Sequence, residues 1–209
     1  APPKAALKDS LFDSHGRQIR DLRLSVTDRC NFRCIYCMAP DVKYIPKMQL
    51  LRLEEYIRVI RIAMSLGINK LRITGGEPTL YPHLDELLQE VGKMGLKDIA
   101  LTTNGSRIRK QWAERWKENG LNRVTVSLDT LKPQRKDAIT RSQTSIVSVI
   151  EAIDHLRDVG LQPVKVNAVV MRGVNDDEII DFADFAIEHN VDMRLIEFMP
   201  LDAGRRWEK

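Results

Sequence analysis

The chain has 209 residues, of which 43% are apolar and 30% charged, so it can bury one sizeable core. Its formal net charge of +4 is too small to indicate nucleic-acid binding, although it is compatible with an anionic small ligand. No apolar run approaches the roughly 20 residues of a membrane span, so no membrane association is expected. All three cysteines fall within residues 30–37, which is unlike a disulfide framework and favours a reducing, intracellular compartment.

Residues 1–18 are interpreted as an N-terminal extension, because APPKAALKDS lacks the apolar core of a secretory signal. Residues 19–209 are interpreted as one domain that begins with a strand at about 21–27. One phrase then recurs, with a glycine, an apolar residue, two spacers and alternating apolar positions: LGINKLRI (66–73), MGLKDIAL (94–101), NGLNRVTV (119–126) and VGLQPVKV (159–166). Each glycine suits the position after a helix, and the alternation predicts a strand. A looser copy, NVDMRLIEF (190–198), predicts a sixth strand.

Apolar residues recur at helical spacing ahead of these strands. They predict helices over about residues 53–64, 84–91, 146–153 and 179–186, with QWAERWKEN (111–119) as a weaker candidate. NDDE (175–178) has the spacing of a capping box and predicts the start of the last helix. Alternating strands and helices imply a parallel sheet with right-handed crossovers. Such a sheet can be an open doubly wound sheet or a curved, incomplete barrel.

The strands alternate between apolar and polar residues, whereas the strands of a doubly wound sheet are nearly continuous apolar runs. Arg23, Arg72 and Lys165 occupy polar positions on three different strands. One sheet face should therefore pack on the helices while the other lines an open interior, which favours an α/β fold with an incomplete (βα)6 TIM-like barrel. Three inward cations would require an anionic partner such as a nucleoside triphosphate, whereas cations at strand ends would simply be solvated.

Cys30, Cys34 and Cys37 form a CxxxCxxC pattern directly after the first expected strand. A structural zinc site usually has four ligands, and the sequence offers no second cysteine pair. A 4Fe–4S cluster held by three thiolates leaves one iron free for an exogenous group, which accounts for the number three. A non-catalytic zinc-binding α/β module that borrows a fourth ligand remains an alternative, as do three ordinary buried cysteines.

The CxxxCxYC pattern resembles the signature of the radical S-adenosylmethionine superfamily, and TGGEPTL (74–80) resembles its second motif. The two glycines of GGEP are expected to let the backbone approach a ligand closely. LTTNG, VSLDTL, VKVNAVVMRGVND and IEFMP then follow in the order seen in the GTP 3′,8-cyclase family, which acts in molybdenum cofactor (molybdopterin) biosynthesis.

This resemblance implies one 4Fe–4S cluster on Cys30, Cys34 and Cys37, with S-adenosylmethionine on its free iron. The residues that match the cofactor contacts of the family are Tyr36, Gly75, Gly76, Glu77, Pro78, Asn104, Ser127 and Met199. Glu77 could receive the ammonium group of the methionine moiety, and Asn104 suits a turn or a ribose contact equally. The residues that match its GTP contacts are Arg23, Arg72, Thr102 and Lys165, with Arg194 as a weaker candidate.

The implied reaction is reductive cleavage of S-adenosylmethionine to a 5′-deoxyadenosyl radical, which removes a hydrogen atom from C3′ of GTP. No general base is assigned. The implied partners are GTP, a reductant protein such as flavodoxin or ferredoxin, and the downstream cyclic pyranopterin monophosphate synthase, while a homodimer remains open. The implied location is the cytoplasm, or the mitochondrial matrix or another organelle in a eukaryote.

Members of this family carry a second 4Fe–4S cluster on a further cysteine trio, and no cysteine follows Cys37 here. We therefore expect the second-cluster region to be missing and the chain to be incomplete for full activity. A radical enzyme acting on a different small molecule or a peptide is the alternative reading.

Overall fold

Six parallel strands form one sheet in the order β1-β2-β3-β4-β5-β6 in a computed structural model that describes residues 10–199. The strands are β1 (Asp21–Ser25), β2 (Lys70–Thr74), β3 (Asp98–Thr103), β4 (Arg123–Ser127), β5 (Lys165–Val170) and β6 (Asp192–Glu197). Each strand pairs in parallel with the next in the sequence. A doubly wound sheet would reverse its strand order at a switch point, so the sequential order confirms the incomplete barrel.

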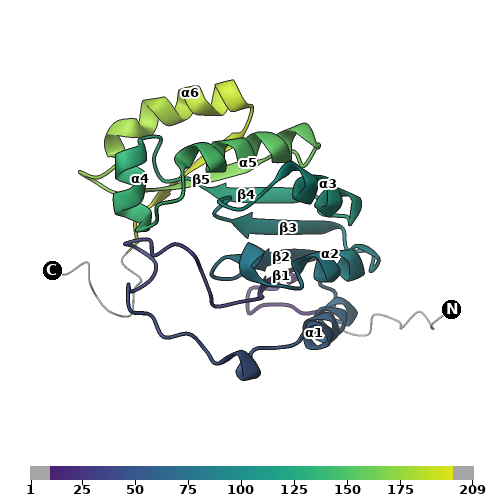
Figure 1. The fold of residues 1–209 in the computed structure, drawn as a ribbon. Helices are drawn as coiled ribbons and strands as arrows, with labels where there is room; N and C mark the ends of the chain where they lie inside the picture. Colours follow the sequence, from purple (N-terminus) through teal and green to yellow (C-terminus); the bar gives the residue numbers. More distant parts are fainter. Residues whose placement is uncertain (1–9, 200–209) are drawn as a thin grey trace.

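The helices cover one face of this sheet (Figure 1). They are α1 (Leu53–Ser65), α2 (Leu84–Gly92), α3 (Lys110–Glu118), α4 (Pro133–Thr140), α5 (Ile146–Asp158) and α6 (Ile179–His189). Three short 3₁₀ helices accompany them, η1 (Lys47–Gln49), η2 (Pro78–Leu80) and η3 (Asp176–Glu178). All five expected helices are present. Helix α4 was not predicted from the sequence, because Ala138 and Ile139 are its only apolar side chains after the initial proline and show no helical spacing.

The residues after the helices have the conformation that the recurring phrase predicts. Gly67, Gly95, Gly120 and Gly160 have φ values of +95°, +79°, +87° and +79°, and Asn190 in the looser copy has +51°. Only glycine adopts this left-handed region without steric cost, and asparagine tolerates it better than most residues. The phrase therefore marks five helix-to-strand turns.

The expected capping box at residues 175–178 is wrong. Asn175 makes no side-chain cap, and a 3₁₀ turn separates it from the start of α6 at Ile179. Its side chain is fully buried, donates hydrogen bonds to the carbonyl oxygens of Asp129 (2.6 Å) and Val169 (2.8 Å), and accepts one from the Met171 amide. Asn175 therefore connects two loops. Its side-chain amide satisfies three buried backbone groups and is not available to cap the helix.

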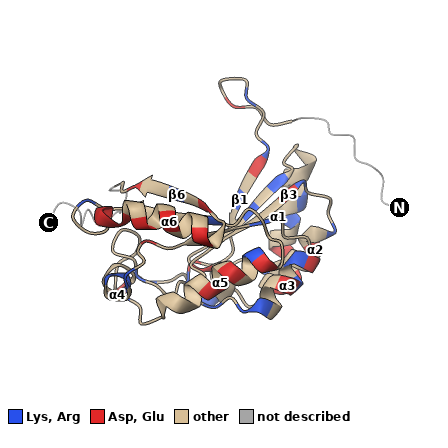
Figure 2. Cartoon of the chain, turned by 90° about the horizontal axis from the view of Figure 1, so that it is seen from above, with Lys and Arg blue, Asp and Glu red and all other residues tan. Residues whose placement is uncertain are grey.

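The alternation in the strands separates the two faces of the sheet as expected. Leu71, Ile73, Val124, Val126 and Val166 are fully buried against the helices. The opposite face is polar, and Figure 2 shows basic segments on neighbouring strands beside the labels of β1 and β3. The sheet edge at β6 and the edge at β1 do not pair with each other within residues 10–199, so this part of the chain forms an open barrel.

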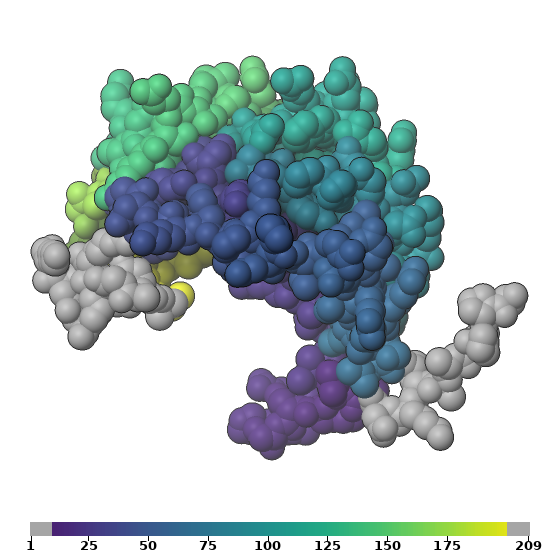
Figure 3. Space-filling view, turned by 60° about the horizontal axis from the view of Figure 1, so that its bottom comes forward, coloured from purple at the N-terminus to yellow at the C-terminus, as the bar shows by residue number. Residues whose placement is uncertain are grey.

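Part of the expected N-terminal extension, residues 1–9, lies outside the described residues. The remainder forms a small turn with an antiparallel bridge between Phe12 and Gln18, and this segment projects from the body of the molecule (Figures 2 and 3). Among residues 10–199, no helix has the length and apolar character needed to cross a membrane.

Candidate functional site

The cysteine-bearing loop starts at the C-terminal end of β1 and is held first by the GGEP turn after β2. The Gly76 amide donates to the Thr27 carbonyl and the Glu77 amide to the Arg29 carbonyl, each at 2.7 Å. A Cβ atom on Gly75 would lie 2.7 Å from the Thr27 oxygen. The glycines are therefore needed for close contact between two protein segments. The sequence predicted that these glycines let the backbone approach a ligand, and both also line the cavity described below.

The second half of the loop rests on α4. The amides of Arg33 and Ile35 donate to the carbonyl oxygens of Thr140 (2.8 Å) and Ile139 (2.9 Å) at the end of this helix. Figure 1 shows the loop running past the C-terminal ends of the strands toward α4. The helix that the sequence analysis missed thus supports the segment between Cys30 and Cys37.

A third attachment joins Tyr36 to the end of β4. Its hydroxyl donates to Asp129 Oδ2 at 2.7 Å, and the Val169 amide donates to Asp129 Oδ1 at 2.9 Å. Burial raises the pKa of both groups, and the nearby Asp129 charge is the next cause for Tyr36. Sequence reasoning did not assign Asp129 to the site, although VSLD at a strand end was the available signal.

The three thiols line one cavity of about 210 Å³ together with the ends of β2, β3 and β4. Burial raises the pKa of all three thiols, and it raises that of Cys34 to about 12 with Asp129 as the next cause. No group of three His, Cys, Asp or Glu side chains within residues 10–199 is arranged to hold a single metal ion. The cysteines therefore share a pocket without converging on one point.

Glu77 also lines this cavity, but its carboxylate is occupied by protein donors. Oε1 accepts from the Thr79 amide (3.0 Å) and from the hydroxyls of Thr79 and Thr103 (both 2.7 Å), and Oε2 accepts from the Asn104 amide (2.7 Å). The side chain is almost fully buried. It joins the GGEP turn to the end of β3, so an ammonium group would have to compete with four existing hydrogen bonds.

Asn104 occupies the turn after β3. Its Oδ1 accepts from the Ser106 amide and hydroxyl, and its Nδ2 donates to Asn31 Oδ1 at 2.9 Å with Cys30 Sγ at 3.9 Å. Of the two roles that the sequence left open, this geometry favours the turn residue. It adds a contact between the turn and the cysteine loop.

Below the cavity, the inner face of the sheet carries a group of cations. The strand register places Arg23 beside Arg72, Arg72 beside Ala100 and Ala100 beside Arg123. Lys165 on β5 and Arg194 on β6 lie on the same inner face. Lys165 pairs with Asp192 and Asn167 with Arg194, so Arg194 is two residues beyond the partner of Lys165 and its side chain points to the same side of the sheet. We call Arg23, Arg72, Arg123, Lys165 and Arg194 the inner cation group.

Electrostatics confirm that these cations are neighbours. Burial, followed by the charges of Arg23, Arg123 and Arg194, lowers the pKa of Arg72. Arg123 was missed by the sequence analysis, although it has the same alternation as Thr125 and Ser127. It forms an ion pair with Asp98, which leaves the other four cations without an acidic partner within 4.0 Å among the described residues.

Two side-chain atoms on the strands, Thr102 Oγ1 on β3 and Asn167 Oδ1 on β5, are buried without a hydrogen-bond partner among residues 10–199. Thr102 lines the thiol cavity, and Asn167 pairs with Ser127, which lines it too. An unpaired buried polar atom costs about 1–3 kcal/mol. These two atoms are therefore available to hydrogen-bond a polar ligand or water inside the barrel.

Comparison with known families agrees with this arrangement, because the sequence model of the Radical SAM superfamily matches residues 24–186. The chain belongs to the radical SAM superfamily. Its solved structural neighbours include Streptococcus suis SuiB bound to S-adenosylmethionine (TM-score 0.74, 23% identity, 88% of this chain and 41% of that chain). Another is coproporphyrinogen III oxidase (HemN) from Escherichia coli (TM-score 0.61, 14% identity, 86% and 43%). At these identities they support the fold alone.

Curated relatives are more similar in sequence. A GTP 3′,8-cyclase of Marinobacter nauticus is 47% identical over 191 residues, which are 91% of this chain and 57% of that protein. A GTP 3′,8-cyclase of Clostridium botulinum (strain Okra) is 42% identical over 198 residues, which are 94% and 61% of the two chains. This chain thus spans less than two thirds of the length of the curated relatives it matches.

Membership of the radical SAM superfamily implies a 4Fe–4S cluster and bound S-adenosylmethionine, and the three thiols of the cavity suit the cluster. Three thiols are soft ligands of the type that iron–sulfur clusters take. Their raised pKa values mean that the pocket by itself disfavours thiolates, a cost that the positive charge of bound iron removes. Tyr36, Gly75, Gly76, Glu77, Asn104 and Ser127 line the same cavity.

Two of the predicted cofactor contacts, Pro78 and Met199, do not line this cavity, and neither do the four predicted GTP contacts that belong to the inner cation group. Pro78 is buried at the start of η2, directly after the cavity residue Glu77. Met199 lies beyond β6, is 55% exposed and does not line the cavity within the described residues. Arg194 belongs to the inner cation group instead. The strand register, which the sequence alone did not provide, places the Arg194 side chain on the inner face of the sheet.

Proposed function

We propose that this chain is the cofactor-binding barrel of a GTP 3′,8-cyclase, which carries out the first step of molybdenum cofactor biosynthesis. The observation that carries the proposal is the inner cation group beneath a cavity lined by three thiols. A triphosphate would offset the mutual repulsion of these cations, and arginine side chains suit bidentate contact with phosphate. The similarity to curated GTP 3′,8-cyclases supports the same substrate.

Cys30, Cys34 and Cys37 would hold the 4Fe–4S cluster. When bound and supplied with one electron, the cluster with S-adenosylmethionine would yield methionine and a 5′-deoxyadenosyl radical for removal of hydrogen from C3′ of GTP. Arg23, Arg72, Lys165 and Arg194 would bind the triphosphate and so orient the ribose toward the cavity. Thr102 lies between the two regions and would contact the nucleotide through its unpaired hydroxyl. The chain itself contributes binding, orientation and exclusion of water, and no side chain is assigned as a general base.

The partners follow from this function. One electron must reach the cluster, so a reductant protein such as flavodoxin or ferredoxin is proposed, in the cytoplasm or an organelle matrix. The cyclised nucleotide would pass to cyclic pyranopterin monophosphate synthase. The match spans 57% and 61% of two curated relatives, and we propose that full cyclisation also needs the remaining part of such a protein, including a second cluster.

The test is anaerobic reconstitution followed by two measurements. Iron, sulfide and zinc analysis should give a four-iron cluster, and zinc without iron would replace the proposal with the zinc-module reading. Reduction in the presence of S-adenosylmethionine should then release 5′-deoxyadenosine faster with GTP than with ATP, CTP or a peptide. Equal release with every candidate would retain the radical chemistry and remove GTP as the substrate. Because the chain has only three cysteines, any iron bound through thiolates must use Cys30, Cys34 or Cys37.

A further inference from the structure

The cysteine loop leaves β1, yet Tyr36 within it is hydrogen-bonded to Asp129 at the end of β4. The two strands are separated in the sheet by β2 and β3, so the loop crosses the C-terminal mouth of the barrel. We propose that Asp129 is a positioning residue, which through the Tyr36 hydroxyl fixes Cys34 and Cys37 in place before any cofactor binds. This inference rests on the proposed use of the three thiols as cluster ligands.

Asp129 is dedicated to this contact. The residue is 6% exposed, and each carboxylate oxygen already accepts a hydrogen bond, Oδ2 from Tyr36 and Oδ1 from the Val169 amide. No Lys, Arg or His nitrogen of residues 10–199 lies within ion-pair distance of it. Lys136, which lines the same cavity, pairs with Asp137 instead. A buried carboxylate without a cation is costly, and its two neutral donors are what offsets that cost.

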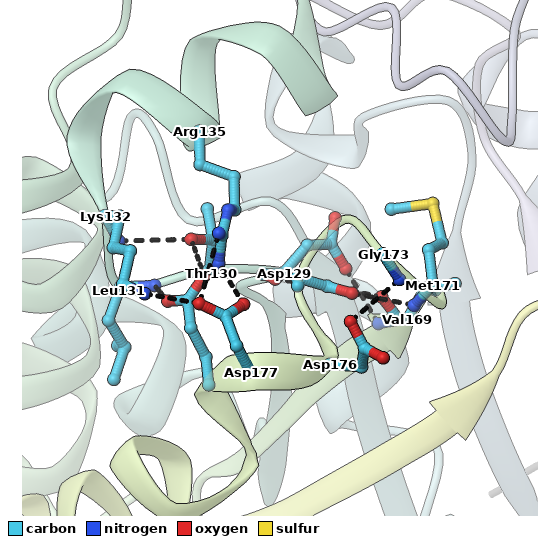
Figure 4. Close-up of polar contacts among 12 residues, drawn as sticks. Asp129, Thr130, Leu131, Lys132, Arg135, Val169, Met171, Gly173, Asp176 and Asp177 are labelled. Carbon is cyan, nitrogen blue, oxygen red and sulfur yellow. Dashed lines mark hydrogen bonds and ion pairs between the residues drawn. The ribbon is translucent and has the colours of Figure 1, made fainter.

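The backbone around Asp129 is firmly held by the connection between β5 and α6 (Figure 4). Asn175 donates to the carbonyl oxygens of Asp129 and Val169, at 2.6 and 2.8 Å. The buried Glu178 accepts from the Thr130 hydroxyl at 2.6 Å and from the Leu131 amide at 2.7 Å. The backbone that carries Asp129 is therefore fixed by hydrogen bonds to Asn175 and Glu178. Because this backbone is fixed, the Asp129 carboxylate can hold the cysteine loop in one position.

On the loop side, Tyr36 lies inside the turn that joins two of the cysteines. The Cys37 amide donates to the Cys34 carbonyl at 2.9 Å, so fixing Tyr36 fixes this turn. Cys30 has separate supports, since the neighbouring Arg29 carbonyl accepts from the Glu77 amide and the Tyr44 hydroxyl donates to the Cys30 carbonyl at 3.2 Å. Loss of the Tyr36–Asp129 bond should therefore loosen the turn from Cys34 to Cys37, which keeps only the bonds of Arg33 and Ile35 to α4, and should spare Cys30.

Hydrogen exchange on the cluster-free, reduced chain tests this asymmetry without nucleotide or cofactor. Tyr36→Phe removes only the hydroxyl, and Tyr81→Phe is a matched control, because the buried Tyr81 hydroxyl has no hydrogen-bond partner among the described residues. Hydrogen bonds to charged groups are worth about 1.5–3 kcal/mol, so the amides of Cys37 and Met38, which donate to the Cys34 carbonyl, should exchange at least about tenfold faster in Tyr36→Phe. The amides of β1, β2 and residues 29–31 should be unchanged.

A second variant separates positioning from general weakening. Asp129→Asn should raise exchange of the same amides, and Tyr36→Phe in that background should add much less than it does alone, because the shared bond is already impaired. Both variants should also take up iron more slowly during reconstitution than Tyr81→Phe does. Additive effects, or exchange in Tyr36→Phe equal to that in Tyr81→Phe, would overturn the proposal. Failure to bind GTP would remove the proposed substrate and leave this comparison intact.

Discussion

Lys165 on β5 and Arg194 on β6 lie on the same inner face of the barrel, where burial and then the charge of Arg194 lower the pKa of Lys165. Arg123 and Arg72 contribute to this shift after Arg194. Asp192, which pairs with Lys165 in the strand register, opposes the shift. The inner cation group is therefore a source of repulsion in the ligand-free barrel and an attractive site for an anion.

Replacing Arg72 by Met should have effects of opposite sign on stability and on binding. The chain without ligand should unfold at slightly higher urea concentration, because the repulsion from Arg23, Arg123 and Arg194 is relieved. The affinity for GTP should fall about tenfold or more, the cost of one charged hydrogen-bond donor. Urea titration and calorimetry measure the two quantities. Lys93→Met, at an exposed i,i+3 pair with Glu90, is the control. Unchanged GTP affinity in Arg72→Met would contradict the assignment of the inner face to the triphosphate.

Lys165 should give the ligand-free chain a distinctive pH dependence. Its pKa is lowered in the folded state, so above that value the unfolded chain binds the extra proton and the free energy of unfolding rises with pH. This rise should continue up to the ordinary lysine pKa of about 10.4. Over the same range GTP affinity should fall, because neutral Lys165 no longer attracts phosphate. Urea titrations across this pH range measure the free energy of unfolding of the wild type minus that of Lys165→Met. This difference should rise with pH, and a difference that declines would refute the prediction.

Gly76→Ala should loosen the attachment of the cysteine loop. The added Cβ would meet the Arg29 carbonyl and, at 2.7 Å, the Asp28 carbonyl oxygen, and both contacts involve backbone that cannot rotate away. We expect a loss of roughly 1–3 kcal/mol in the free energy of unfolding, as for overpacked sites, and weaker iron loading. Gly95→Ala is the control, since its Cβ meets nothing within 4 Å and it carries only the strain of φ +79°. Its stability should fall while iron loading stays normal, so equal iron loading in both variants would count against the prediction.

Glu178→Leu should destabilise the platform below Asp129. The carboxylate is fully buried and accepts from Thr130, Leu131 and Arg135, so its removal leaves buried donors unpaired. We expect a loss on the order of 2 kcal/mol or more in urea titration. Asp177→Asn is a matched control, because this neighbouring acid also pairs with Arg135 but its side chain is 52% exposed. It should leave the midpoint nearly unchanged at neutral pH, and similar losses in both variants would show that burial is not the cause.

Much of the fold could be predicted from sequence periodicity. The alternation of apolar residues gave all six strands and the polarity of the sheet face, and it placed Arg23, Arg72 and Lys165 inward. The same alternation contained Arg123, which was overlooked. Helix α4 could not be found in this way, because it is anchored by buried Lys136 and by the cysteine loop and has no apolar stripe of its own.

The sequence by itself determined which residue types carry the chemistry. Three clustered thiols, a GGEP turn and cations at strand spacing are local patterns, and local patterns can be recognised from the order of residues alone. Only the tertiary structure decided what each group contacts. It showed that the GGEP glycines face the backbone of Thr27, Asp28 and Arg29, that the Glu77 carboxylate already accepts hydrogen bonds from the protein, and that Asn175 joins two loops. It also paired Tyr36 with Asp129 across 93 positions of sequence. Hydrogen bonds of such long range depend on which loops the folded sheet brings together, and no local spacing records that.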